Sequence, residues 1–107
     1  MEGRRLARMY CYVWEYQVRS EDVELFLEQY GSDGSWVALF SRAPGYVGTQ
    51  LLQDRADPGR FLTIDTWETA AAYASFRAQF HREYEQLDRR FAALTLSESH
   101  VGDFEVR

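Results

Sequence analysis

The chain has 107 residues, of which 46% are hydrophobic and 16% aromatic, a composition typical of one globular domain with no room for a second. Its net charge of −5, with arginine supplying all 12 basic residues, argues against nucleic-acid binding, which needs a clustered basic surface. The single cysteine, Cys11, excludes an intrachain disulfide and a cysteine-rich metal site.

The first predicted element is a strand over residues 9–18, which are rich in aromatic and β-branched residues. Aromatic side chains alternate along one face of this strand, at Tyr10, Tyr12, Trp14 and Tyr16. A helix follows, with Ser20 as the predicted N-cap and a break near residues 31–34. Its apolar stripe is Val23, Phe26, Leu27 and Tyr30, and a second short helix over residues 36–42 presents Trp36, Leu39 and Phe40.

Residues 46–54 and 60–68 read as two further strands, joined as a hairpin at the turn Asp57-Pro58-Gly59. One long helix is then predicted from Thr69, with Thr69 or Thr66 as its cap. Its stripe keeps spacings of three and four through Tyr73, Phe76, Phe80, Tyr84, Leu87, Phe91 and Leu94. Residues 95–106 are the predicted last strand.

This order predicts an α+β fold of the ferredoxin-like βαββαβ type, with a four-stranded antiparallel sheet and both helices on one face. The first and third strands should lie in the centre of the sheet. The opposite face would then carry Val13, Leu52, Leu62 and Ile64, which cannot remain in contact with water. We therefore expect a homodimer that packs sheet against sheet.

Three stretches carry a resemblance: residues 44–49 (PGYVGT), residues 65–69 (DTWET), and the pair Tyr73 and Phe76. With these, the sequence resembles the antibiotic biosynthesis monooxygenase family over essentially its whole length. The resemblance implies a single dimeric α+β barrel domain over residues 1–107. Members of the family include cofactor-independent oxygenases of polycyclic phenols and anthrones, haem-degrading oxygenases, and many proteins of unknown role.

In the anthrone-oxidising members, a strand tryptophan and a helix tyrosine six residues later line the pocket, and Trp67 and Tyr73 match these positions. Those members also use an asparagine four residues before the tryptophan, where this chain has Thr63, whose hydroxyl lacks the paired donor and acceptor of an amide. The haem-degrading members need an asparagine on the first strand. This chain contains no asparagine, so haem degradation is rejected and no cofactor is expected.

The two-residue period of a strand places Thr63, Asp65 and Trp67 on one face. A carboxylate among aromatic side chains would have a raised pKa and could act as a general base. Alternatively, Asp65 pairs with an arginine or a hydroxyl and is structural. His81 lies at the edge of the long helical stripe, where it is either a second acid/base or a solvated side chain. The two histidines of the chain, His81 and His100, do not form a metal-binding motif, and no metal site is predicted.

The candidate catalytic residues are therefore Asp65, Trp67 and His81. The candidate substrate-binding residues are Tyr12, Trp14, Tyr16, Trp36, Phe40, Thr63, Tyr73, Phe76 and Tyr84, a mostly aromatic set suited to a planar ligand. Two functions remain open: an oxygenase of planar phenols, anthrones or quinols, or a non-oxidative pocket protein such as an isomerase, a cyclase or a binder of aromatic ligands. No apolar run has the length of a signal peptide or membrane span, so we expect a cytoplasmic protein with a small aromatic partner and no membrane or nucleic-acid partner.

Overall fold

The computed structural model describes residues 8–107, so the first seven residues of the predicted domain lie outside the described range. The strands are β1 (Tyr10–Gln17), β2 (Tyr46–Gln53), β3 (Arg60–Trp67) and β4 (Ser97–Glu105). The α-helices are α2 (Val23–Tyr30), α3 (Ser35–Phe40), α4 (Ala70–Gln79) and α5 (His81–Phe91). Two 3-10 turns, η1 (Ser20–Asp22) and η2 (Ala92–Leu94), precede α2 and follow α5.

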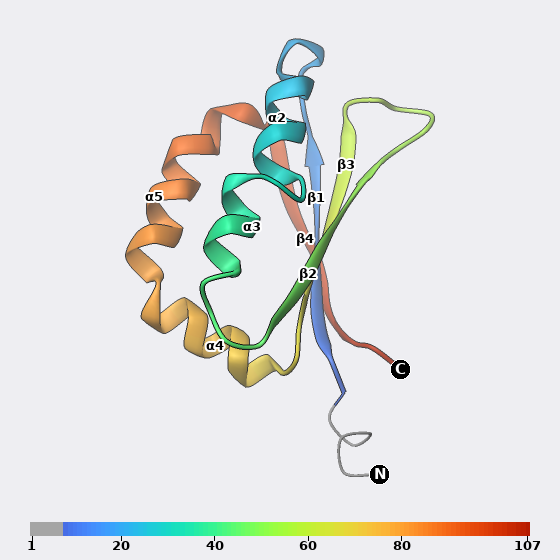
Figure 1. Ribbon diagram of the computed structural model, residues 1–107. Helices are drawn as coiled ribbons and strands as arrows, with labels where there is room; N and C mark the ends of the chain where they lie inside the picture. The colour runs from blue at the N-terminus through green and yellow to red at the C-terminus, as the bar shows by residue number, and fades with distance from the viewer. Residues whose placement is uncertain (1–7) are drawn as a thin grey trace.

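The strands form one antiparallel sheet in the order β2-β3-β1-β4, so the first and third strands are central as predicted. All four helices lie on the same side of the sheet, and in the part of the chain that is described none covers the other side (Figure 1). The ferredoxin-like α+β arrangement expected from the sequence is confirmed.

Local hydrogen bonds confirm two of the sequence signals and contradict a third. The Asp57 side chain accepts from the Gly59 amide at 3.1 Å in the β2–β3 turn, and the Thr69 hydroxyl accepts from the Ala72 amide at 3.0 Å as the cap of α4. The prediction of Ser20 as an N-cap was wrong. Ser20 is itself the first residue of η1, and no side chain caps either η1 or α2.

The single long helix predicted after Thr69 is two helices, separated at Phe80, where φ is −112° and ψ is 24°. Neither glycine nor proline marks the break. Phe80 is only 8% exposed: its ring stacks on Phe76 with centroids 5.6 Å apart, and the Arg42 guanidinium lies 4.9 Å from its centroid. On either side of this bend, α4 buries Phe76 and α5 buries Phe91 in the same aromatic core.

The core lies between the helices and the sheet, and Phe26, Phe61 and Trp67 have no exposed surface. Leu27, predicted in the stripe of α2, is 39% exposed, because this short helix buries only the line through Phe26 and Tyr30.

The opposite face of the sheet carries the predicted apolar residues. Strand β3 alternates strictly between buried side chains under the helices and half-buried ones facing away. Register places Val13 beside Ile64, and Leu52 beside Leu62, on this second face. Within residues 8–107, no helix combines the length and the apolarity that crossing a bilayer requires.

Candidate functional site

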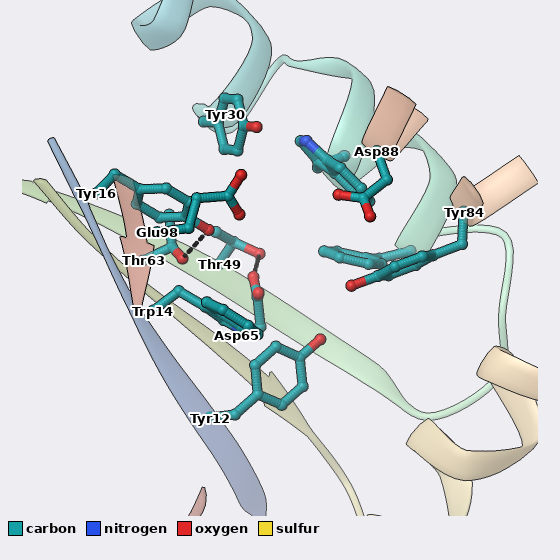
Figure 2. Close-up of a pocket in the computed structure, with 12 residues that line it drawn as sticks. Tyr12, Trp14, Tyr16, Tyr30, Thr49, Thr63, Asp65, Tyr84, Asp88 and Glu98 are labelled. Carbon is teal, nitrogen blue, oxygen red and sulfur yellow. Dashed lines mark hydrogen bonds between the residues drawn. The ribbon is translucent and has the colours of Figure 1, made fainter. Parts of the chain in front are cut away.

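A cavity of about 140 Å³ lies between the sheet and the helices. Its walls are mainly aromatic, with a few hydroxyls and carboxyls (Figure 2). The lining residues are Tyr12, Trp14, Tyr16, Tyr30, Trp36, Phe40, Thr49, Thr63, Asp65, Tyr84, Asp88 and Glu98. They come from all four strands and from α2, α3 and α5, so the cavity is a product of the whole fold.

Asp65 is the buried charge of this cavity, with only 6% of its surface exposed. Its carboxylate accepts a hydrogen bond of 2.5 Å from the Thr49 hydroxyl, which is in turn 2.6 Å from the Tyr46 hydroxyl. Among residues 8–107, no arginine or histidine pairs with it. Burial raises the pKa of Asp65 to about 6, although the Thr49 hydrogen bond lowers it.

Tyr12 lies directly opposite Asp65 on the neighbouring strand β1. Its hydroxyl accepts a hydrogen bond from the Trp67 indole N–H at 3.3 Å. Burial, and then the nearby charge of Asp65, raise the pKa of Tyr12 far above its usual range. The phenol therefore stays protonated, and its own hydrogen is free to be donated to a ligand.

Two further pairs of polar side chains complete the interior of the cavity. The hydroxyls of Tyr16 and Thr63 are 3.1 Å apart and hydrogen-bonded, so the two side chains hold each other in place. Burial raises the pKa of the Tyr30 hydroxyl to about 12, although the nearby Trp36 indole N–H lowers it. That N–H makes no hydrogen bond of normal geometry within the described residues. Trp36 thus presents an unused donor in the cavity wall.

The mouth of the cavity is acidic. Asp88 on α5 and Glu98 on β4 are exposed residues whose carboxyls converge from opposite sides (Figure 2). Desolvation, together with the charge of Asp88, raises the pKa of Glu98. Tyr84, one helical turn before Asp88, completes this wall.

Four predicted site residues do not line the cavity. Trp67 and Phe76 lie behind it in the core, where Trp67 reaches the cavity only through its bond to Tyr12. Tyr73 packs on the Tyr12 ring at 4.6 Å and accepts a hydrogen bond from Arg77. His81 is an exposed residue at the start of α5, outside the lining. The other predicted residues, Tyr12, Trp14, Tyr16, Trp36, Phe40, Thr63, Asp65 and Tyr84, do come together around the cavity.

Sequence reasoning missed Tyr30, Thr49, Asp88 and Glu98 as lining residues. Asp88 had a usable signal, since it follows Tyr84 by four residues and so shares its helix face. Thr49 and Glu98 could be placed only from strand register, which sets Thr49 opposite Asp65 and Glu98 opposite Tyr16. Among residues 8–107, no group of three or more potential ligands is placed to hold a metal ion.

Comparison with known proteins places this fold in a family. The family model described as antibiotic biosynthesis monooxygenase matches residues 9–90. SnoaB, a cofactor-independent oxygenase from Streptomyces nogalater, has a similar structure, with a TM-score of 0.71 and 23% identity over 94% of this chain and 95% of that one.

Two other solved structures are also similar. A protein from Nitrosomonas europaea has a TM-score of 0.69 and 20% identity, over 92% of this chain and 89% of that one. A conserved protein from Methanosarcina mazei has a TM-score of 0.69 and 11% identity, over 94% and 95%. No curated protein sequence matches this chain. Because the family model covers most of the sequence, the chain belongs to the antibiotic biosynthesis monooxygenase family.

Proposed function

We propose that this protein is a cofactor-independent oxygenase of small planar phenols, anthrones or quinols. The observation that carries the proposal is Asp65, a buried carboxyl in an aromatic cavity whose pKa of about 6 suits a general base near neutral pH. Membership of the family and the likeness to SnoaB support the oxygenase class.

The size of the cavity supports a ligand that enters edge-first. Its volume of about 140 Å³ is close to that of an apolar cavity known to bind benzene. One aromatic ring can therefore be enclosed, while further fused rings extend toward the mouth. Aromatic walls on several sides suit a flat ring system.

In the proposed reaction, Asp65 removes a proton from the acidic C–H of an anthrone or from a phenol. Tyr12 donates a hydrogen bond to the oxygen on which negative charge develops, a role that its raised pKa permits. For an anthrone, the carbanion gives an electron to O₂, and the radical pair combines and takes up a proton to form a hydroperoxide. Loss of water leaves a carbonyl at the former CH₂, so one oxygen atom enters the product, the other leaves as water, and the substrate supplies all the electrons.

The test is oxygen uptake with a panel of anthrones and quinols, comparing the native protein with Asp65→Asn. We expect the substitution to lower the catalysed rate by about 100-fold or more, the range of general-base contributions. Asp33→Asn makes the same change at an exposed turn residue outside the cavity and should leave the rate unchanged. No uptake above background with the native protein for the whole panel would contradict the proposal.

A loss of activity in Asp65→Asn should not result from unfolding of the variant. The pKa of Asp65 is about 6 in the folded protein, against an ordinary value of 3.8, so the folded state binds the proton more tightly. Between those values, stability falls as pH rises and the buried carboxyl becomes charged. Asp65→Asn removes that charge, so at neutral pH its midpoint of thermal unfolding should not fall below the native one.

A proton-transfer enzyme, such as an isomerase or a cyclase, is the second candidate. It is favoured by the placement of a base, Asp65, opposite a protonated phenol, Tyr12, because enolisation uses a general base together with a hydrogen-bond donor. Exchange of the substrate's acidic hydrogen for deuterium under anaerobic conditions is expected of both candidates. Exchange without oxygen uptake in air would select the proton-transfer enzyme.

A further inference from the structure

The cavity has a one-sided distribution of charge. Three carboxyls line it, those of Asp65, Asp88 and Glu98, and no arginine or histidine does. We infer that its ligand is a planar aromatic compound bearing a basic amino group, with the ring beside Asp65 and the ammonium group between Asp88 and Glu98. This inference rests on the proposed function, because it names the substrate class of the same site.

The cavity is too small to enclose the whole of such a ligand. The enclosed space holds about one ring, so the rest of the ligand must lie toward the mouth. There the exposed residues Asp88 and Glu98, both in the lining, point their carboxyls toward one another (Figure 2). Desolvation of Glu98, and after it the charge of Asp88, raise the pKa of the Glu98 carboxyl. A cation placed between the two carboxyls would offset the repulsion between them.

Aromatic rings at the same end suit a cation as well as a flat ring. Trp36 packs edge-on against Tyr84 at 5.1 Å between centroids, and Tyr30 lies 6.1 Å from Trp36. An ammonium group is attracted to the faces of such rings, most strongly to tryptophan. Carboxylates combined with a partial aromatic cage form a site that prefers an organic cation over a neutral group.

The same arrangement disfavours anionic ligands. In the described chain, none of the three carboxyls takes part in an ion pair that would neutralise it. Arg77 is the basic residue packed on the cavity wall. It is already engaged, because its guanidinium lies 3.9 Å from the Tyr84 ring centroid and donates to the Tyr73 hydroxyl at 3.1 Å.

The experiment compares three matched probes by calorimetric titration: a naphthol bearing an aminomethyl, a hydroxymethyl or a carboxymethyl group at the same ring position. We expect the ammonium probe to bind at least about tenfold more tightly than the neutral one, and the carboxylate probe to bind most weakly. The preference should shrink at high salt, because exposed charges at the mouth are screened.

Matched variants separate the mouth from the overall charge of the protein. Replacing both Asp88→Asn and Glu98→Gln should bring the ammonium and neutral probes close to equal affinity. Replacing both Glu24→Gln and Glu85→Gln removes the same net charge at exposed helical residues outside the lining and should leave the preference intact. Thermal unfolding of each variant checks that the fold is retained.

Equal binding of the three probes, tighter binding of the carboxylate, no binding of any probe, or a preference that survives the mouth substitutions would overturn the inference. These results are independent of oxygen chemistry. A charge preference without oxygen uptake would support the ligand class while the oxygenase proposal failed. Oxygen uptake with neutral anthrones and no charge preference would support the oxygenase proposal while the inferred ligand class failed.

Discussion

At the scale of single residues, the sequence predicted which side chains of β3 face the helices, because strict alternation fixes Thr63, Asp65 and Trp67 on one side. It could not predict the partner of Asp65. That partner, Thr49, is set by the β2–β3 register, and nothing in the local pattern around it distinguishes it from other strand residues. The Thr49 hydroxyl must donate to Asp65, so the Tyr46 hydroxyl donates to Thr49 in turn.

Replacing Thr49→Val should raise the pKa of the Asp65 carboxyl further. The hydrogen bond from Thr49 stabilises the charged form, so its loss favours the protonated one. A hydrogen bond to a charged group corresponds to a change of roughly one pH unit or more. Titration of the carboxyl by carbon NMR measures this directly, and the acid limb of any pH–rate profile should move to higher pH by the same amount.

The control for this titration is Thr49→Ser, which keeps the hydroxyl and should keep the pKa near the native value. Thr63→Val removes a neighbouring hydroxyl that bonds Tyr16 rather than Asp65, and it should have the smaller effect of the two valine substitutions. If Thr49→Val and the native protein titrate together, the hydroxyl does not hold the Asp65 carboxylate.

At the scale of elements, the sequence pattern predicted the four strands and the helical segments between them, but it did not predict the break between α4 and α5. The stripe through Phe76, Phe80 and Tyr84 has unbroken helical spacing, so the pattern alone predicts one helix. The break coincides with the buried Phe80 ring, which packs against Phe76 and the Arg42 guanidinium, contacts that the local sequence pattern does not reveal. After the break, Tyr84 and Asp88 of α5 line the cavity.

Because the Phe80 ring is buried at the break, Phe80→Ala should be strongly destabilising. Truncation of a buried phenylalanine typically lowers the free energy of unfolding by about 3–5 kcal/mol, and Phe80 is 8% exposed. Denaturant titration provides the measurement, and Phe80→Leu should show a smaller loss. Its exposed neighbour gives the reference variant, Gln79→Ala, for which we expect a change within about 0.5 kcal/mol. A similarly small effect of Phe80→Ala would show that the packing of this ring contributes little to stability.

At the scale of the whole molecule, strand order and the side occupied by the helices followed from connectivity rules applied to the predicted elements. The two faces of the sheet then have different roles. One face encloses the cavity, and the other presents an apolar centre around Val13, Ile64 and Leu62, bordered by the ion pair between Arg60 and Glu15 at 2.7 Å. A chain of this size buries only about two-thirds of its unfolded surface, so covering this second face would add stability.

We propose that a second copy of the chain covers this outer face, which predicts a dimer by size-exclusion chromatography with light scattering. Ile64→Arg, at the centre of the face, should shift the protein to monomer, because dimerisation would bury an unpaired charge. Phe104→Arg provides a second test on the edge strand β4, where the side chain is 47% exposed and the substitution spares the core. Leu25→Arg, at a residue 46% exposed on α2 across the sheet, is the matched control and should remain dimeric. A native monomer, or outer-face variants that elute with the control, would show that this face is not the interface.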